Sequence, residues 1–478
     1  MAKRSSAPSR GRNAPVSDPN IKDFAAFDPR RPLAQELNTN VADGFSLCVV
    51  GDCILSRPLS HYESVEPAFA KILAVLRASD ATCGNLETTI LDLASFQGHP
   101  YAWDGDWPLS SLPAVTQDFA KMGFNLLARA NNHTLDWGLE GMRETSRRLD
   151  EAGLIHAGSG ETQGLARAPR YFESPKGRVA LVSMVSTFRP TSDALAPRHA
   201  APGRPGVSAL RLKHINVVPR EVMAKLREVA KAVLSPAQLE AATKSSRLSL
   251  FGKEFEIGER TGYRHEMDPD DLAGILYNIR QGKQSADVLI ATIHAHEIAA
   301  EGFPELPSYF LRDLAKAAID AGADVFAVSG IHHLGPVEIY KGRPIFYGLG
   351  NFFWSDMQES LPEELFQINR ASLARAFVKP ELATDADITG LLNAQSFANE
   401  VTFESVAAVN RFRGNRVSEV RLYPVDLFYG APLTQSGIPR LATGKKARKI
   451  IARLQDSSRD FGSDVRIKLR DGIGLIRL

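Results

Sequence analysis

Residues 128–138 place amide, imidazole and carboxylate side chains together in one short segment. The segment reads Ala-Arg-Ala-Asn-Asn-His-Thr-Leu-Asp-Trp-Gly, follows an apolar run at 124–127 and precedes a helical pattern at 141–152. A strand is therefore expected to deliver these side chains to the edge of a sheet, where α/β folds bind their ligands. An amide oxygen can bind a hard metal ion, and an adjacent imidazole can move a proton at neutral pH.

Four further apolar runs end in residues of the same chemical kind. The five sets are Asp52, Glu87, Asn132-His133, His294-Ala295-His296-Glu297 and His332-His333. Oxygen and imidazole ligands without a thiolate suit hydrolytic divalent ions such as Mn²⁺, Zn²⁺ or Fe²⁺. Two such ions about 4 Å apart can activate water and stabilise the charge of a transition state. The sequence therefore predicts one or two divalent metal ions.

Each of these sets also has a purely structural interpretation. Gly51-Asp52 could form a turn, and Glu87 could be a helix N-terminal charge that the helix dipole stabilises. His294 and His296 lie on one face of an extended segment, either as ligands or as a buried hydrogen-bonded pair. His332-His333 cannot both point inward if extended, so one of them is expected to be structural. The metal interpretation is favoured because all the sets follow apolar strands.

Strand-like and helix-like runs alternate along the chain and would position these residues. Strands are expected at 45–50, 80–83, 124–130, 178–186, 287–293 and 324–328. Helices are expected between them at 67–78, 112–122, 141–152, 269–281 and 308–321. This β-α-β rhythm predicts an α/β fold with a largely parallel sheet covered by helices. Hairpin patterns follow at 337–349 and 401–426, the second with its turn at Gly414-Asn415.

The sequence suggests one main domain with additions. Residues 1–40 are interpreted as a disordered or extended leader, 41–430 as the main domain and 431–478 as a C-terminal helix and tail. Residues of about 200–268 are expected to form an insertion over the sheet. The helix-like stretch at 355–399 has no sheet partner and is expected to cap the site.

Composition excludes several classes of protein. The 478 residues include 44% hydrophobic and 23% charged residues, which is ordinary for a soluble globular protein. The net charge of +2, with basic clusters only at 3–12 and 445–453, gives no argument for nucleic acid. No apolar run approaches the roughly 20 residues of a membrane span, and no secretory signal is visible. Three cysteines without paired spacing suit buried thiols in a reducing compartment, so a cytoplasmic protein is expected.

In combination, six sequence words resemble the CapA family of capsule and poly-γ-glutamate synthesis, a branch of the calcineurin-like metallophosphatases. The words are GDCILSR at 51–57, GNLET at 84–88, NNHTLDWG at 131–138, IHAHE at 293–297, DAGADV at 320–325 and GPVEIYKGRPIFYGLGNF at 335–352. The resemblance spans about 46–351. It implies a four-layer α/β/β/α sandwich with a metal centre at the strand ends, and the insertion at 200–268 would be helical.

Matching positions imply a ligand set for that centre. Asp52, Glu87 and Asn132 would be oxygen ligands, and His294 and His332 would be nitrogen ligands. The substrate would be anionic.

The same resemblance implies roles in catalysis and substrate binding. His133 would be the general acid that protonates the leaving group, and Asp136 would orient it or cap the following helix. Arg57 and Asn85 would contact an anionic substrate, since an Arg fork can bind a carboxylate or phosphate with two hydrogen bonds.

The chain departs from the family pattern at one strand end. The family usually has two histidines there; here the second position is His332, and the first falls on Ser329 or Gly330. A metal ligand could therefore be missing, which would leave a single-metal or degenerate site. Alternatively, His333 or His296 could substitute.

Two hypotheses from different classes follow. The first is a metal-dependent hydrolase that acts on a phosphoester or a poly-γ-glutamate-like amide. The second is a non-catalytic component that binds an anionic polymer within a biosynthetic complex. A nucleic-acid phosphodiesterase would fit the metal chemistry but lacks the basic surface that its substrate favours.

Overall fold

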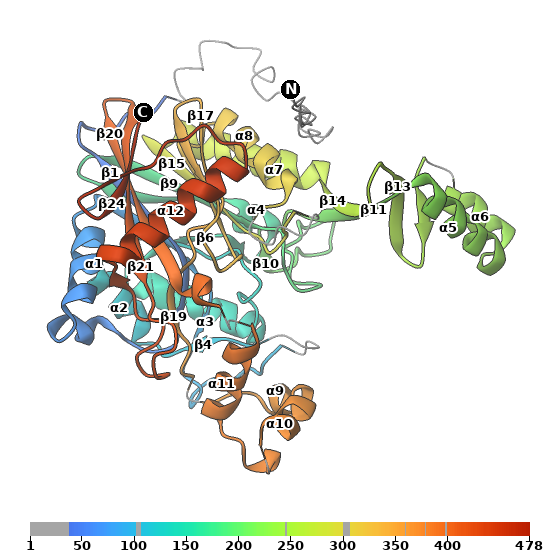
Figure 1. The fold of residues 1–478 in the computed structure, drawn as a ribbon, viewed down its shortest axis with the longest axis horizontal. Coiled ribbons are helices and arrows are strands. Elements are labelled where there is room, and N and C mark those ends of the chain that lie inside the picture. Colours follow the sequence, from blue (N-terminus) through green and yellow to red (C-terminus); the bar gives the residue numbers. More distant parts are fainter. Residues whose placement is uncertain are drawn as a thin grey trace, which may run out of the picture.

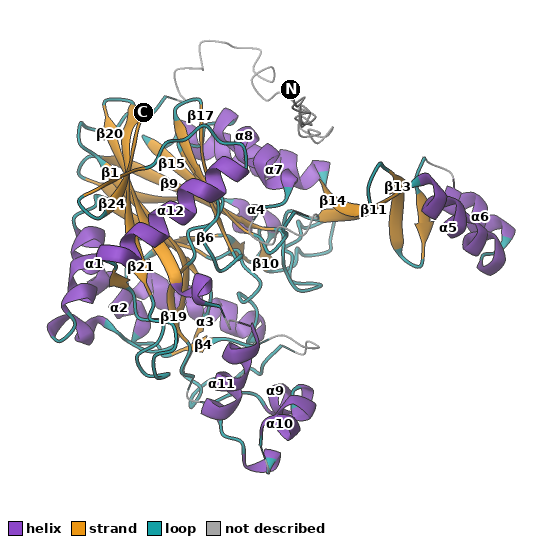
Figure 2. Ribbon diagram, viewed as in Figure 1, coloured by secondary structure: helices purple, strands orange, loops and turns teal. Residues whose placement is uncertain are grey.

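The computed structural model of the protein describes residues 38–101, 107–243, 246–299, 306–358, 360–377, 379–396 and 399–478. The leader predicted at 1–40 lies almost entirely outside the described residues. The mixed α/β class is confirmed, with several sheets and helices distributed between them (Figure 2).

The first strand belongs to a ten-stranded sheet with the order β23-β24-β21-β20-β1-β2-β5-β6, in which β19 also pairs with β1 and β22 with β21. Its strands are β1 (Ser46–Leu55), β2 (Ala81–Leu86), β5 (Leu126–Ala128), β6 (Ile155–Ala157), β19 (Asn351–Ser355), β20 (Glu404–Arg413), β21 (Arg416–Asp426), β22 (Arg440–Leu441), β23 (Lys468–Arg470) and β24 (Ile473–Arg477). Strands β19, β1, β2, β5 and β6 are parallel, whereas β20, β21 and β24 are antiparallel.

A second sheet of six strands has the order β17-β18-β16-β15-β9-β8. Its strands are β8 (Arg170–Ser174), β9 (Gly177–Val185), β15 (Val288–His294), β16 (Val325–Ser329), β17 (Val337–Tyr340) and β18 (Arg343–Phe346). The expected parallel arrangement occupies its centre, and both edge pairs are antiparallel. The predicted hairpin turn at Gly414-Asn415 joins β20 to β21 in the first sheet.

The two sheets share one apolar core because alternate residues of each strand point to the same side. Leu47 and Val49 of β1 pack in a cluster with Leu181 and Ile290 of the second sheet. All ten residues of β1 are buried, since its opposite face is covered as well.

Helices cover the two outer faces. Cys48 and Val50 pack with residues of α1 (Pro67–Arg77) and α2 (Val115–Met122) on the first sheet. On the second sheet, α7 (Pro269–Gln284) and α8 (Tyr309–Asp320) contribute to a separate cluster with Leu289 and Phe326. Figure 1 shows these helices outside the strands. The remaining helices near the sheets are α3 (Gly138–Glu151), α4 (Gln163–Arg167) and α12 (Gly444–Asp460).

A four-stranded sheet projects from this body with the order β12-β13-β11-β14 (Figure 1). It consists of β11 (Leu212–Val218), β12 (Leu248–Leu250), β13 (Lys253–Ile257) and β14 (Gly262–Met267), with α5 (Arg220–Val233) and α6 (Pro236–Thr243). Its own apolar cluster includes Met223 and Leu248. The insertion at about 200–268, expected to be helical, thus holds a four-stranded sheet as well as two helices. Phe251 and Gly252 adopt positive φ and join β12 to β13 as a hairpin.

Short helices fill the stretch after β19, as the sequence predicts. They are α9 (Glu363–Ile368), α10 (Arg370–Ala376) and α11 (Asp385–Ser396), with a small apolar cluster around Leu365 and Leu373. Two short bridging pairs complete the fold, β3 (Thr89–Ile90) with β4 (Ser110–Ser111) and β7 (Ser159–Gly160) with β10 (Gly206–Val207). Within the described ranges, none of the helices has the length and apolar character needed to cross a bilayer.

Gly51 provides a test of the contact between β1 and β19. A Cβ atom on Gly51 would lie 1.8 Å from the carbonyl oxygen of Gly350, so Gly51→Ala must displace the backbone. We expect the free energy of unfolding to fall by more than about 2 kcal/mol in urea denaturation. Gly390→Ala is the matched control, because a Cβ there meets nothing within 4 Å and lies in helix α11. Equal stability of the two variants would contradict the packing described.

Candidate metal centre

The carboxyl ends of strands from both large sheets meet at one place. Parallel pairing aligns Asp52 of β1 with Asn85 of β2 in the first sheet. In the second sheet, His294 at the end of β15 is aligned with Ser329 at the end of β16. The contacts described below join these two strand pairs, so residues more than 200 positions apart share one site.

Two buried carboxylates form the centre of the site. Asp52 and Glu87 are 1% and 0% exposed. The amide nitrogen of Asn85 donates to both, at 2.9 Å to Asp52 Oδ1 and 3.3 Å to Glu87 Oε2. Asn131 in turn donates from Nδ2 to Asn85 Oδ1 at 3.2 Å and to the carbonyl oxygen of Leu86 at 2.7 Å. Asn85 is thus fixed between the carboxylates by a neighbour that sequence reasoning did not single out.

Asp52, Glu87 and His332 form the first group that could hold a metal ion, with one potential ligand atom of each within 4.8 Å of the others. His332 Nδ1 lies 3.4 Å from Asp52 Oδ2, and Nε2 lies 3.8 Å from Glu87 Oε1. His332 Nδ1 is also 2.8 Å from the side-chain oxygen of Asn351. A proton on Nδ1 would be donated there and leave the Nε2 lone pair facing Glu87.

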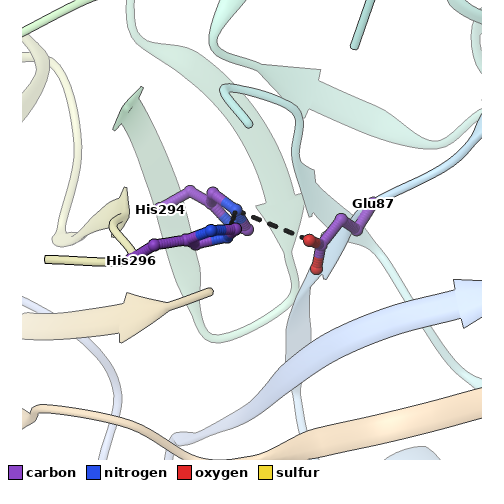
Figure 3. Close-up of side chains that lie close together, drawn as sticks. All are labelled: Glu87, His294 and His296. Carbon is purple, nitrogen blue, oxygen red and sulfur yellow. Dashed lines mark hydrogen bonds and ion pairs between the residues drawn. The ribbon is translucent and has the colours of Figure 1, made fainter. Parts of the chain in front are cut away.

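Glu87, His294 and His296 form a second group within the same distance limit. Figure 3 shows both imidazoles on the side of the Glu87 carboxylate, with His294 Nε2 3.5 Å from Glu87 Oε1. The two Nε2 atoms of the histidines are 3.0 Å apart. His296 is exposed, whereas the other two residues are buried. Because Glu87 belongs to both groups, its carboxylate lies between two adjacent candidate ion positions.

Ser329 and Gly330, where the chain departs from the family pattern, contact two of the candidate ligands. Ser329 Oγ lies 3.1 Å from His294 Nδ1, so a proton on Nδ1 leaves the Nε2 lone pair available to a metal ion. The backbone N–H of Gly330 donates to Asp52 Oδ2 at 3.1 Å. Gly330 has φ +101°, and a Cβ there would lie 2.8 Å from His296 Cδ2. A larger residue at this position would therefore collide with His296.

Electrostatics keep two of the candidate ligands unprotonated near neutral pH. Burial would raise the pKa of Asp52, but the hydrogen bond to His332 and the nearby His294 hold it well below its usual range. Burial lowers the pKa of His294 well below its ordinary value, and the neighbouring His296 adds to this shift. Metal ligands must be deprotonated, so both side chains are in the form that binding requires.

His133 lies beside the Glu87 carboxylate and also contacts a buried ion pair between Asp136 and Arg189. Its Nε2 atom lies 3.9 Å from Glu87 Oε1, and its Nδ1 atom lies 2.8 Å from Asp136 Oδ2. Arg189 contacts the other Asp136 oxygen at 2.7 Å and is 3% exposed. No side chain caps α3, so the contacts of Asp136 are to His133, Arg189 and the backbone N–H of Leu109. Arg189 lies in the loop after β9 and carried no recognisable sequence signal.

Three further residues, Asn132, Arg57 and Asp356, differ in how they relate to the site. The side-chain oxygen of Asn132 is buried and has no hydrogen-bond partner among the described residues, so it is available as an oxygen ligand for a metal ion. Arg57 donates to the carbonyl oxygen of Thr434 at 2.8 Å and belongs to neither metal group. Asp356, which sequence reasoning missed, follows β19; burial raises its pKa to about 7, partly offset by Gln358 and His133.

Residues 46–355 match the protein family described as bacterial capsule synthesis protein PGA_cap. The chain belongs to this family. The resemblance stated from the sequence words is thereby confirmed, and the family is one that is linked to capsule and poly-glutamate synthesis.

Relatives of this PGA_cap protein support the same assignment. The uncharacterized protein y4sH of Sinorhizobium fredii is 44% identical over 464 residues, which cover 95% of this chain and 97% of the relative. The PGA biosynthesis protein CapA of Bacillus subtilis is 22% identical over 332 residues, 69% of this chain and 68% of its own length. The capsule biosynthesis protein CapA of Bacillus anthracis is 25% identical over 311 residues, 64% and 59% of the two chains.

Because Glu87 belongs to both groups, its substitution should weaken metal binding more than substitution of a residue that belongs to one group. We expect Glu87→Gln to weaken Mn²⁺ or Zn²⁺ binding at least about 100-fold in calorimetric titration, because it replaces the carboxylate that both groups share with a neutral amide. His296→Ala should have a smaller effect, since Asp52, Glu87 and His332 stay in place. His214→Ala, on the projecting sheet, is the control and should bind as the wild type does. A chelator-treated wild type that takes up neither ion would contradict the site.

The shifted His294 pKa predicts acid sensitivity of the metal-free protein. His294 is neutral when folded, so below about pH 6.5 only the unfolded chain takes up its proton, and stability falls by up to about 1.4 kcal/mol per pH unit. His294→Asn should reduce this slope between pH 6.5 and 5. Asp52→Asn should not, because the depressed pKa of Asp52 places its loss of stability below about pH 4. Equal slopes in wild type and His294→Asn would contradict this reasoning.

Proposed function

We propose that this PGA_cap protein is a metal-dependent hydrolase that acts on an anionic substrate of capsule or poly-γ-glutamate metabolism. The observation that carries the proposal is the pair of metal-binding groups that share Glu87, placed directly beside the His133–Asp136 pair. A structural histidine cluster would not need an acid–base pair at its rim, whereas metal-dependent hydrolysis can use bound ions together with a group that protonates the leaving atom. The two sheets and their outer helices are inferred to form the four-layer sandwich of the metallophosphatases.

One or two divalent ions (Mn²⁺, Zn²⁺ or Fe²⁺) would be held by Asp52, Glu87 and His332, with Asn132, and by Glu87, His294 and His296. Such ions activate water and stabilise developing negative charge when bound. In this interpretation His296 supplies the nitrogen ligand that is missing at Ser329. Ser329 instead orients His294 through its Nδ1 atom.

His133 is proposed as the general acid. Its Nδ1 atom is occupied by Asp136, so Nε2, which faces the carboxylates, is the atom that would give a proton to the leaving oxygen or nitrogen. Asp136 fixes the ring, and Arg189 fixes Asp136 from the other side. Both carboxylate oxygens of Asp136 are thus engaged, which limits rotation of the imidazole.

The substrate class follows from charge and from the relatives. The B. subtilis and B. anthracis proteins are described as PGA and capsule biosynthesis proteins, so a γ-glutamyl-type amide is proposed ahead of a phosphoester. Arg57 is the proposed contact for a substrate carboxylate. The amide nitrogen of Asn85 contacts Asp52, Glu87 and Nδ1 of His294, so we propose that Asn85 holds these side chains rather than the substrate.

The decisive experiment measures hydrolysis of poly-γ-glutamate and of p-nitrophenyl phosphate by the metal-loaded protein. His133→Ala is expected to lower kcat by about 10²- to 10⁴-fold, the usual contribution of a general acid, with metal binding retained. His61→Ala replaces an exposed histidine outside the site and should leave kcat unchanged.

Full activity of His133→Ala, or activity that survives chelation, would contradict the hydrolase. Polymer binding without turnover in any metal-loaded form would instead indicate an accessory component of a biosynthetic complex. The observation that favours this second function is Ser329, which lies where the family usually has a histidine ligand.

A further inference from the structure

A groove rich in basic residues lies at the end of the first sheet that is remote from the metal centre. It consists of two cavities of about 670 and 710 Å³ that share Phe412, Arg413, Ser418 and Leu478. We call the lining of these two adjacent cavities the basic groove. Its walls come from β20, β21, β24 and the turn between β17 and β18, and Figure 1 shows β20 beside the C-terminus.

The groove carries an excess of cations. Its basic residues are Lys341, Arg343, Arg411, Arg413, Arg416, Arg421 and Arg477, against the acidic residues Asp43, Asp324 and Glu419. Three cations are paired: Lys341 with Asp320, Arg343 with Asp324, and Arg421 with Glu419.

The other four arginines have no ion-pair partner in the part of the chain that the structure describes: Arg411, Arg413, Arg416 and Arg477. Strand register explains why several of these cations share one wall. Arg411 is aligned with Glu419, and Glu419 with Arg477, so a row crosses three neighbouring strands. Phe412, Val420 and Ile476 point the other way into the core. Neighbouring strands lie about 4.8 Å apart, so the backbones at Arg411 and Arg477 are about 10 Å from one another.

The groove is separate from the metal centre. Arg411 pairs with Ser46 at the start of β1, whereas Asp52 lies six residues further along the same strand. At about 3.3 Å per residue, this separates the two regions by about 20 Å. A ligand confined to one region would not contact the other.

We propose that the basic groove is a second binding site, for an extended polycarboxylate chain of the poly-glutamate type. The choice of polymer rests on the proposed function; the site itself rests on the unpaired arginines. Cations spread over several strands suit a ligand with a carboxylate on every repeat, because each guanidinium can form a charge-assisted fork with a different unit. Among the described residues that line these cavities, the one aromatic side chain, Phe412, is buried, so no aromatic ring there is exposed for nucleic-acid bases to stack on.

The test measures binding of a fluorescent poly-γ-glutamate oligomer to the full chain in the presence of a chelator. The triple variant Arg411→Gln, Arg413→Gln, Arg477→Gln is expected to bind at least about tenfold more weakly, with a shallower salt dependence. The matched control Arg220→Gln, Lys225→Gln, Arg227→Gln removes three exposed charges on α5 and should bind as the wild type does. Thermal melting of both variants checks that they fold.

Other outcomes would overturn the proposal. An equal loss in the control variant would show unspecific attraction, and unchanged binding in the groove variant would place the polymer elsewhere. Tighter binding of polyphosphate or single-stranded DNA would exclude a polycarboxylate site. Failure of the proposed hydrolase is distinguishable, because Glu87→Gln should lose turnover while its chelator-independent polymer binding stays within about twofold of wild type.

Discussion

Two carboxylates buried next to each other impose the main physical constraint on this protein. An oxygen of Asp52 and one of Glu87 lie within 4.8 Å, where two full charges at an effective dielectric constant of about 20 repel by about 3 kcal/mol. A shared amide from Asn85, the Gly330 N–H and two imidazoles surround them. These contacts come from the ends of β2 in the first sheet and of β15 and β16 in the second, so the two sheets must meet in one register for the site to exist.

The sequence was sufficient to predict which strand ends converge. Asp52, Glu87, His294 and His332 each follow an apolar run, and parallel strands bring such positions to one edge. The role of Ser329 could not be predicted, because a hydroxyl contact with His294 depends on the pairing of β15 with β16 rather than on residue type. Arg189 was missed for the same reason: a lone arginine in a loop has no periodicity, and only tertiary structure brings it to Asp136.

Fold prediction succeeded where burial is local and failed where pairing is long-range. The runs that became β1, β9, β15 and β16 are apolar on both faces and could be recognised directly. The division into two sheets is not visible in such runs, since an apolar strand does not specify its neighbour. The expected C-terminal tail instead forms β23 and β24, which extend the first sheet beside β21. The alternation of apolar and polar residues in these two short strands is too brief to distinguish a strand from an irregular tail.

The projecting sheet has a consequence for how the family can diversify. The chain leaves the body along β11 and returns along β14, and the two strands pair from Leu212 opposite Met267 to Val217 opposite Gly262. Because exit and return are adjacent, the residues beyond them can be shortened to a hairpin turn or exchanged for another module without moving the flanking strands. Evolution can thus vary one appendage while the two large sheets and the strand ends that meet between them are inherited intact.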